Sequence, residues 1–158
     1  MRLGITGHRG LNPEVETVVK IALRERLAAF DADELVLVSC IADGPDAWAA
    51  EFALELSGRI EVVVPASEYR GALPQDHHPT YDRLISAASE LYSTGMTDSS
   101  EQAHMAGSRI LVDRVDALLA VWDGLPARGY GGTADVVEYA RSKSVPVDVV
   151  WPEGASRD

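Results

Sequence analysis

Apolar residues recur along this chain with two spacings that alternate from beginning to end. Short apolar runs, typical of buried parallel strands, occupy residues 2–6, 35–39, 60–64, 117–122 and 147–151. Between them, apolar residues recur three or four positions apart, which predicts amphipathic helices. We expect these helices at residues 15–30, 47–56, 81–90, 100–114 and 133–142, with a further short strand at 91–94.

This alternation predicts an α/β fold in a single Rossmann-like, doubly wound domain, with a mainly parallel sheet and helices on both faces. A length of 158 residues fits one domain. We place that nucleotide-binding domain at residues 1–153 and expect residues 154–158 to form a disordered tail. The polar stretch 66–79 reads as the longest loop, and long loops in compact domains often serve as binding loops or lids.

Local signals support the first helix in particular. Asn12 is a plausible N-cap, and Pro13 suits the first turn of a helix.

Composition and charge narrow the classes of partner. Apolar residues make up 46% of the chain and charged residues 25%, as in ordinary globular domains. The formal net charge of −11 repels phosphate backbones and anionic lipids, so we expect neither nucleic acid nor a membrane as a partner. An anionic small molecule would have to be held by local donors.

Other sequence features point to an intracellular protein. The single cysteine, Cys40, excludes an internal disulfide and reads as a small apolar residue at a strand end. No apolar run reaches the roughly 18 residues of a membrane span. Because the first residues enter a strand directly, we expect no signal peptide and a cytoplasmic location.

Unusual residues gather where the predicted strands end. In open α/β sheets, ligands bind beyond the carboxyl ends of the strands, at the switch in strand order. The candidate ligand-binding residues are Gly7, His8, Arg9, Gly44, Asp46, Arg109, Gly131, Gly132 and Thr133.

The segment 128–133 carries the strongest local signal. Glycines let a backbone approach a ligand closely, and the helix behind them offers unpaired N–H groups and a positive dipole end. With the hydroxyl of Thr133, these groups form a candidate phosphate cradle; the alternative is a flexible turn in which Thr133 is an ordinary N-cap. The chain has neither a G-x-x-x-x-G-K-[ST] loop nor a G-x-G-x-x-G fingerprint, which disfavours an NTPase or a nicotinamide-dependent oxidoreductase.

The remaining candidates have open alternatives. Arg9 either pairs with a phosphate or carboxylate or is exposed to solvent. His8 either lies at the ligand or bonds a backbone carbonyl. Asp46 suits a ribose hydroxyl or helix capping. His77 and His78 read as a polar loop pair, and no metal-ligand spacing is present, so we expect no metal and no cofactor.

Taken together, these clusters resemble the SLOG superfamily, which includes the LOG phosphoribohydrolases, the DNA-processing protein DprA/Smf and the small YpsA-like proteins. The opening Ile-Thr-Gly-His-Arg is similar to the YpsA-like start. The similar segments further along are 42–51, 109–122 and 131–140, so that the match spans nearly the whole chain in order. The resemblance implies a Rossmann-like fold, a nucleotide-related ligand and self-association as a homodimer or higher homo-oligomer.

The resemblance also separates two functions. LOG enzymes carry a catalytic glutamate at the position of Val136, which favours binding or sensing of a nucleotide-like ligand without chemistry. The alternative is a hydrolase that cleaves an N-glycosidic or phosphoribosyl bond of a nucleoside monophosphate. Such an enzyme needs a carboxylate near the ribose, for which the candidates are Asp46, Asp135 and Glu138.

Overall fold

The computed structural model describes residues 1–157 and has six strands in one sheet. The strands are β1 (Arg2–Gly7), β2 (Val36–Ser39), β3 (Arg59–Val64), β4 (Glu90–Ser93), β5 (Ala117–Val121) and β6 (Val147–Val150). The helices are α1 (Pro13–Ala28), α2 (Pro45–Glu55), α3 (Tyr69–Ala72), α4 (His78–Ala87), α5 (Glu101–Asp113) and α6 (Thr133–Ser142), with a 3₁₀ turn at Gln75–His77.

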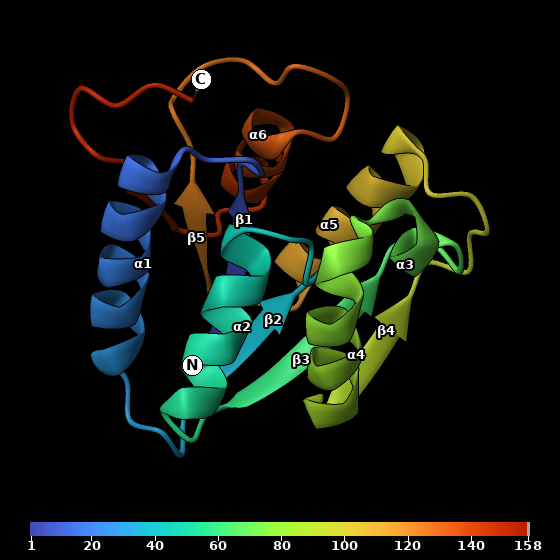
Figure 1. Ribbon diagram of the computed structural model, residues 1–158, viewed down its shortest axis with the longest axis horizontal. Coiled ribbons are helices and arrows are strands. Elements are labelled where there is room, and N and C mark those ends of the chain that lie inside the picture. The colour runs from blue at the N-terminus through green and yellow to red at the C-terminus, as the bar shows by residue number, and fades with distance from the viewer. Residues whose placement is uncertain (158) are drawn as a thin grey trace.

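The sheet is parallel throughout, in the order β4-β3-β2-β1-β5-β6. Figure 1 shows α1, α2 and α4 in front of the strands and α5 and α6 behind them. The chain builds outward from β1 to β4, then returns through α5 to place β5 on the other side of β1. The predicted doubly wound α/β fold is confirmed, and its switch in strand order lies between β1 and β5.

The ends of the helices follow from local chemistry. Asn12 caps α1, since its Oδ1 accepts the Val15 N–H at 3.0 Å, and Pro13 opens the helix as predicted. Ser100 caps α5 in the same way, accepting the Ala103 N–H at 3.1 Å. These side chains satisfy N–H groups that the first helical turn leaves without an intrahelical partner.

The core lies on both faces of the central strands. All four residues of β2 are buried, which explains its unbroken apolar run. The face of α1 that meets the sheet carries buried residues at every fourth position, namely Val15, Val19, Leu23 and Leu27. Within residues 1–157, no helix is long and apolar enough to cross a membrane.

The stretch 66–79 departs from the prediction of one long polar loop. It contains α3 and the 3₁₀ turn, and α4 begins inside it at His78. Ala66, Tyr69 and Leu73 are buried. The sequence pattern did not reveal these helical turns, because polar residues separate the buried ones and each turn is too short for a helical spacing to repeat.

The chain end also has more structure than expected. Within residues 154–157, predicted to be disordered, Ala155 packs on the core and Arg157 is partly buried, whereas Gly154 and Ser156 are exposed. Asp158 lies outside the described residues.

Candidate functional site

A cavity of about 300 Å³ opens at the carboxyl ends of the strands, beside the switch between β1 and β5. Its walls come from the end of β1, the starts of α2 and α6, the inner face of α5 and the α3 region. Loops after β1 and β5 leave the sheet on opposite faces, so a crevice between them follows from the topology. The volume is at the small end of the usual range for small-molecule sites.

The end of β1 forms the floor of this cavity. Gly7 has no side chain, and a Cβ there would lie 2.8 Å from the Cβ of Val121. His8 is buried, and its Nε2 accepts the backbone N–H of Asp123 at 3.1 Å. Burial lowers the pKa of His8 and keeps its ring neutral, as an acceptor nitrogen requires. His8 therefore fastens the loop after β5 while its ring borders the cavity.

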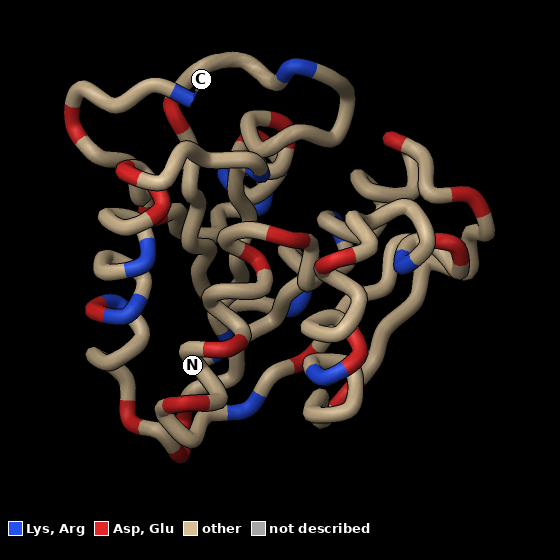
Figure 2. The backbone as a smooth tube through the Cα atoms, viewed as in Figure 1, with Lys and Arg blue, Asp and Glu red and all other residues tan. Residues whose placement is uncertain are grey.

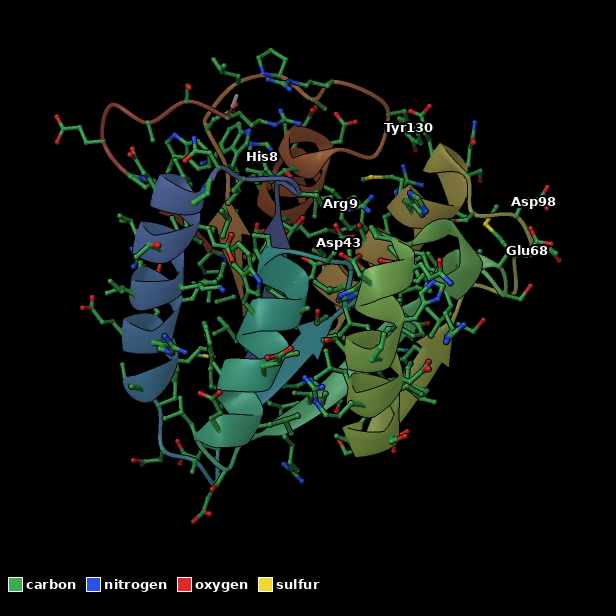
Figure 3. All side chains as sticks on the ribbon, in the orientation of Figure 1. His8, Arg9, Asp43, Glu68, Asp98 and Tyr130 are labelled. Atoms are coloured by element: carbon green, nitrogen blue, oxygen red, sulfur yellow. The ribbon has the colours of Figure 1, made fainter. Side chains whose placement is uncertain are left out.

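Arg9 stands at the mouth of the cavity. Its Nη2 lies 2.6 Å from Oδ1 of Asp43, and its side chain is 49% exposed. Figure 3 shows His8, Arg9 and Asp43 above the strand ends, with Tyr130 across from them on the loop that precedes α6. An exposed, partnered guanidinium of this kind is held in place yet stays available to an anion from solvent.

The turn after β2 is strained. Ile41 has a φ of +48°, which is rare for a β-branched residue. Its N–H donates to Oγ of Ser39 at 2.9 Å, and its carbonyl accepts from Nε2 of His77 at 2.9 Å. His77 is thus buried and bonded to this turn, and it is not an exposed loop residue. The strained turn directs the chain from β2 into the start of α2.

Asp46 lies in the first turn of α2, where Gly44 is the N-cap with a φ of +99°. Asp46 does not cap the helix, and its side chain lines the cavity. Burial raises its pKa to about 7, against the opposing effects of a hydrogen bond from the Ala42 backbone and the charge of Arg9. The cavity therefore contains a carboxyl group that exchanges a proton near neutral pH.

The start of α6 closes the opposite wall. Gly132 is the N-cap and offers no side-chain bond, so Thr133 is the first helical residue and not the cap. Gly131 has a φ of +84°, and a Cβ on Gly132 would lie 2.9 Å from the Cβ of Ala127. The backbone therefore requires glycine at both positions. Thr133 and Val136 both line the cavity.

Arg109, Asp135 and Glu138 lie elsewhere. They line a second, shallower groove between α5 and α6, and the structure does not bring them to the main cavity. The Arg109 guanidinium donates to the Tyr130 hydroxyl at 3.3 Å. The Asp135 carboxylate accepts the Gly131 N–H at 2.9 Å, which stabilises the glycine turn. Of the three candidate catalytic carboxylates, only Asp46 faces the cavity.

Several cavity residues escaped the sequence analysis. Tyr69 and Ser99 were hidden in stretches read as loop, and Arg157 in the expected tail. His104 contacts Ser99 through Nε2 at 2.8 Å and packs edge-on against the Tyr69 ring. Only tertiary packing brings these residues together, because they come from three separate segments.

The single cysteine has a structural role. Cys40 is buried at the end of β2, and burial raises the pKa of its thiol, so that it is an unreactive part of the wall. Among residues 1–157, no three His, Cys, Asp or Glu side chains are grouped as a metal site would require.

Proteins of known structure share this fold. DNA processing protein A of Helicobacter pylori, described for its single-stranded DNA binding mode, is 19% identical with a TM-score of 0.70; the match covers 100% of this chain and 68% of that chain. DNA processing protein A of Streptococcus pneumoniae is 17% identical with a TM-score of 0.71, and the match covers 98% of this chain and 52% of that chain. This chain therefore spans about half of that second protein.

A molybdenum cofactor carrier protein from Chlamydomonas reinhardtii also matches, with 16% identity, a TM-score of 0.59, and coverage of 94% of this chain and 74% of that chain. No protein-family model and no curated protein matches the chain. At these identities the comparisons establish the fold alone.

The exclusion of nucleic acid as a partner is wrong. It rested on the net charge of −11, whereas this fold occurs in a protein whose structure describes single-stranded DNA binding. Net charge averages over the whole surface, but a bound phosphate responds to charges within about a Debye length. Figure 2 shows basic residues on the terminal segment and on the loop after β5, above the strand ends, with acidic residues on the same segments.

The resemblance drawn from the sequence is thus confirmed for the fold, while the likeness to the YpsA-like proteins in particular stays a prediction. The chain has the Rossmann-like fold that these solved structures share.

Proposed function

We propose that this protein binds a nucleoside monophosphate or a similar phosphorylated small molecule in the cavity between β1 and β5. The observation that carries the proposal is the convergence of three kinds of group on one cavity: the open start of α6, a carboxyl with a pKa of about 7, and arginines at the mouth. Each of these groups acts at short range, so its effect on a ligand does not depend on the overall charge.

The phosphate would bind at the start of α6. The Asp135 and Val136 N–H groups bond the Gly132 carbonyl, whereas the N–H groups of the two preceding residues have no acceptor within the helix. Together with the Thr133 hydroxyl and the helix dipole, they provide donors for a phosphate. The tight packing around Gly132 fixes these donors before a ligand arrives.

The nucleoside would extend from there toward α2 and α3. Asp46, which lines the cavity, would accept a hydrogen bond from a ribose hydroxyl when ionised and donate one when protonated. The ring of Tyr69 and the side chain of Leu73 add apolar wall on the same side. Mixed walls with a few placed polar groups are typical of small-molecule sites.

Isothermal titration calorimetry with a panel of nucleoside monophosphates tests the proposal. Binding of at least one of them, weakened and less salt-dependent in Arg9→Ala, is the expected result, since Arg9 supplies local positive charge. Binding of single-stranded DNA with no detectable binding of any mononucleotide would replace the proposal with a nucleic-acid function. Native mass spectrometry of the purified protein would show a co-purifying ligand directly.

Asp46 favours a second candidate function, hydrolysis of the N-glycosidic bond of the same ligand. A carboxyl with a pKa near 7 is suited to general acid–base catalysis. Val136 lines the cavity but transfers no proton, and Asp135 and Glu138 lie on the other groove. Binding without turnover remains the leading proposal, and self-association stays a prediction.

Release of free base from the panel distinguishes the two functions. We expect no turnover by the wild type. Turnover that disappears in Asp46→Asn, with nucleotide binding retained, would establish the hydrolase instead. Val136→Glu is the informative gain-of-function variant, because it places a carboxylate in the cavity at the start of α6.

A further inference from the structure

The segment that follows β6 turns back toward the mouth of the cavity. The Ala155 N–H donates to the Pro152 carbonyl at 3.1 Å, which closes a four-residue turn. Gly154, at the third position of that turn, has a φ of +76°, as a type II turn requires of this position. The return of the chain is therefore encoded by local residues. Figure 1 shows the chain end above the strands, beside the loop after β5.

Two contacts fasten the turn to the site. The Trp151 indole N–H donates to the Ala155 carbonyl at 3.1 Å. The same indole packs edge-on against the His8 ring, with the ring centroids 5.7 Å apart. His8 also holds the loop after β5, so the turn, the end of β1 and that loop form one connected unit.

This turn delivers Arg157 to the cavity. Arg157 lines the cavity, and its side chain is 18% exposed. The nearest Asp123 carboxylate oxygen lies 3.9 Å away, beyond the 2.7–3.2 Å of a hydrogen bond. That carboxylate already accepts the Leu125 N–H at 3.0 Å. After burial itself, the charge of Arg157 is the largest influence lowering the pKa of His8, which places this charge close to the floor of the site.

We propose that Arg157, supplied by the terminal segment, binds the phosphate of the ligand and makes the site select a phosphomonoester over the unphosphorylated nucleoside. This inference rests on the proposed function. A guanidinium binds phosphate through two parallel hydrogen bonds, and Arg157 would then lose its long contact with Asp123 in favour of a doubly bonded anion. The terminal segment would become more ordered as the ligand binds.

The test compares AMP with adenosine by calorimetry in the wild type and three variants. Arg157→Ala is expected to weaken AMP binding about tenfold and to leave adenosine binding within twofold, since adenosine carries no phosphate. Arg157→Lys should restore a large part of the AMP affinity, because it keeps the charge but loses the bidentate geometry. Arg59→Ala is the matched control, as Arg59 is exposed at the opposite end of the sheet.

A second variant separates the turn from the side chain. Gly154→Val strains the turn at its positive φ while keeping Arg157, so it should reproduce the loss for AMP. Hydrogen exchange of residues 151–157 should slow on AMP binding in the wild type and not in Gly154→Val.

Two outcomes overturn the inference and leave the proposed function standing. One is AMP affinity in Arg157→Ala equal to that of Arg59→Ala; the other is an equal loss for AMP and adenosine, which indicates a structural role. Failure of the wild type to bind AMP or any other nucleoside monophosphate would instead overturn the proposed function, and this inference with it.

Discussion

Charged side chains are arranged in opposite ways at the two ends of the sheet. At the amino end, Arg2 of β1 holds the carboxylate of Glu61 on β3 with both terminal nitrogens, and the Tyr92 hydroxyl donates to the same carboxylate at 3.0 Å. The Arg2 Nε donates to the Arg114 carbonyl at 2.6 Å, and the Arg114 guanidinium covers the Tyr92 ring. Every member of this network is bound by another member.

At the carboxyl end, the polar groups converge on a space. Asp46 and Thr133 line a cavity, and Arg9 is held by a single carboxylate and half exposed. The backbone there is strained at Ile41. The same sheet therefore has a closed ion network that stabilises the fold and, at its other end, an open set of polar groups that is free to contact the proposed ligand.

The largest expected effect is on stability, at the amino end. Glu61→Ala should lower the free energy of unfolding by about 2 kcal/mol, because it removes the carboxylate that the partly exposed Arg2 and the Tyr92 hydroxyl both bond. Urea unfolding measures this loss. Ligand affinity should stay within twofold, and a larger drop in affinity would mean that the two ends are coupled.

The same pair predicts a pH dependence. The hydrogen bond from Arg2 lowers the pKa of Glu61 below its unfolded value of about 4.3. The pair therefore contributes its full stability above that value, and the contribution is lost as the pH falls through the lower folded pKa.

The next effect is on affinity, at the carboxyl end. Thr133→Val keeps the volume of the side chain and removes its hydroxyl, which should weaken nucleotide binding about tenfold with little change in unfolding free energy. Thr17→Val on the exposed face of α1 is the control. Equal affinity in the two variants, measured by calorimetry, would remove the start of α6 from the site.

A smaller effect concerns Asp46 and pH. Burial raises its folded pKa to about 7, so its protonated form stabilises the fold below the unfolded value of about 3.9 and this contribution is lost as the pH rises through 7. The wild type should lose about 1 kcal/mol of stability between pH 6 and 7 relative to Asp46→Asn. Asp33→Asn, at an exposed position, should instead follow the wild type.

The smallest effect is expected on the second groove. Glu138→Gln should leave nucleotide affinity and any base release unchanged within twofold, since Glu138 is exposed and lies outside the cavity. A clear loss of either would show that the groove between α5 and α6 is the ligand site, and would reverse the assignment of the two pockets.

The amino-acid sequence by itself determined the order of strands and helices. The spacing of apolar residues and the Asn12 cap are local properties, so they can be predicted without knowledge of distant contacts. The glycine cluster before α6 could also be recognised in the sequence, because the backbone conformation that requires Gly131 and Gly132 is set within a few residues of them.

Only the tertiary structure decided which of the candidates share a cavity. Asp46 and Asp135 were equal candidates in the sequence, yet one faces the cavity and the other bonds the Gly131 N–H. Arg157 joined the site through a turn that looked like a disordered tail. The physical reason is that a side chain's direction depends on helix rotation and on contacts between segments far apart in the chain, which neither spacing nor net charge records.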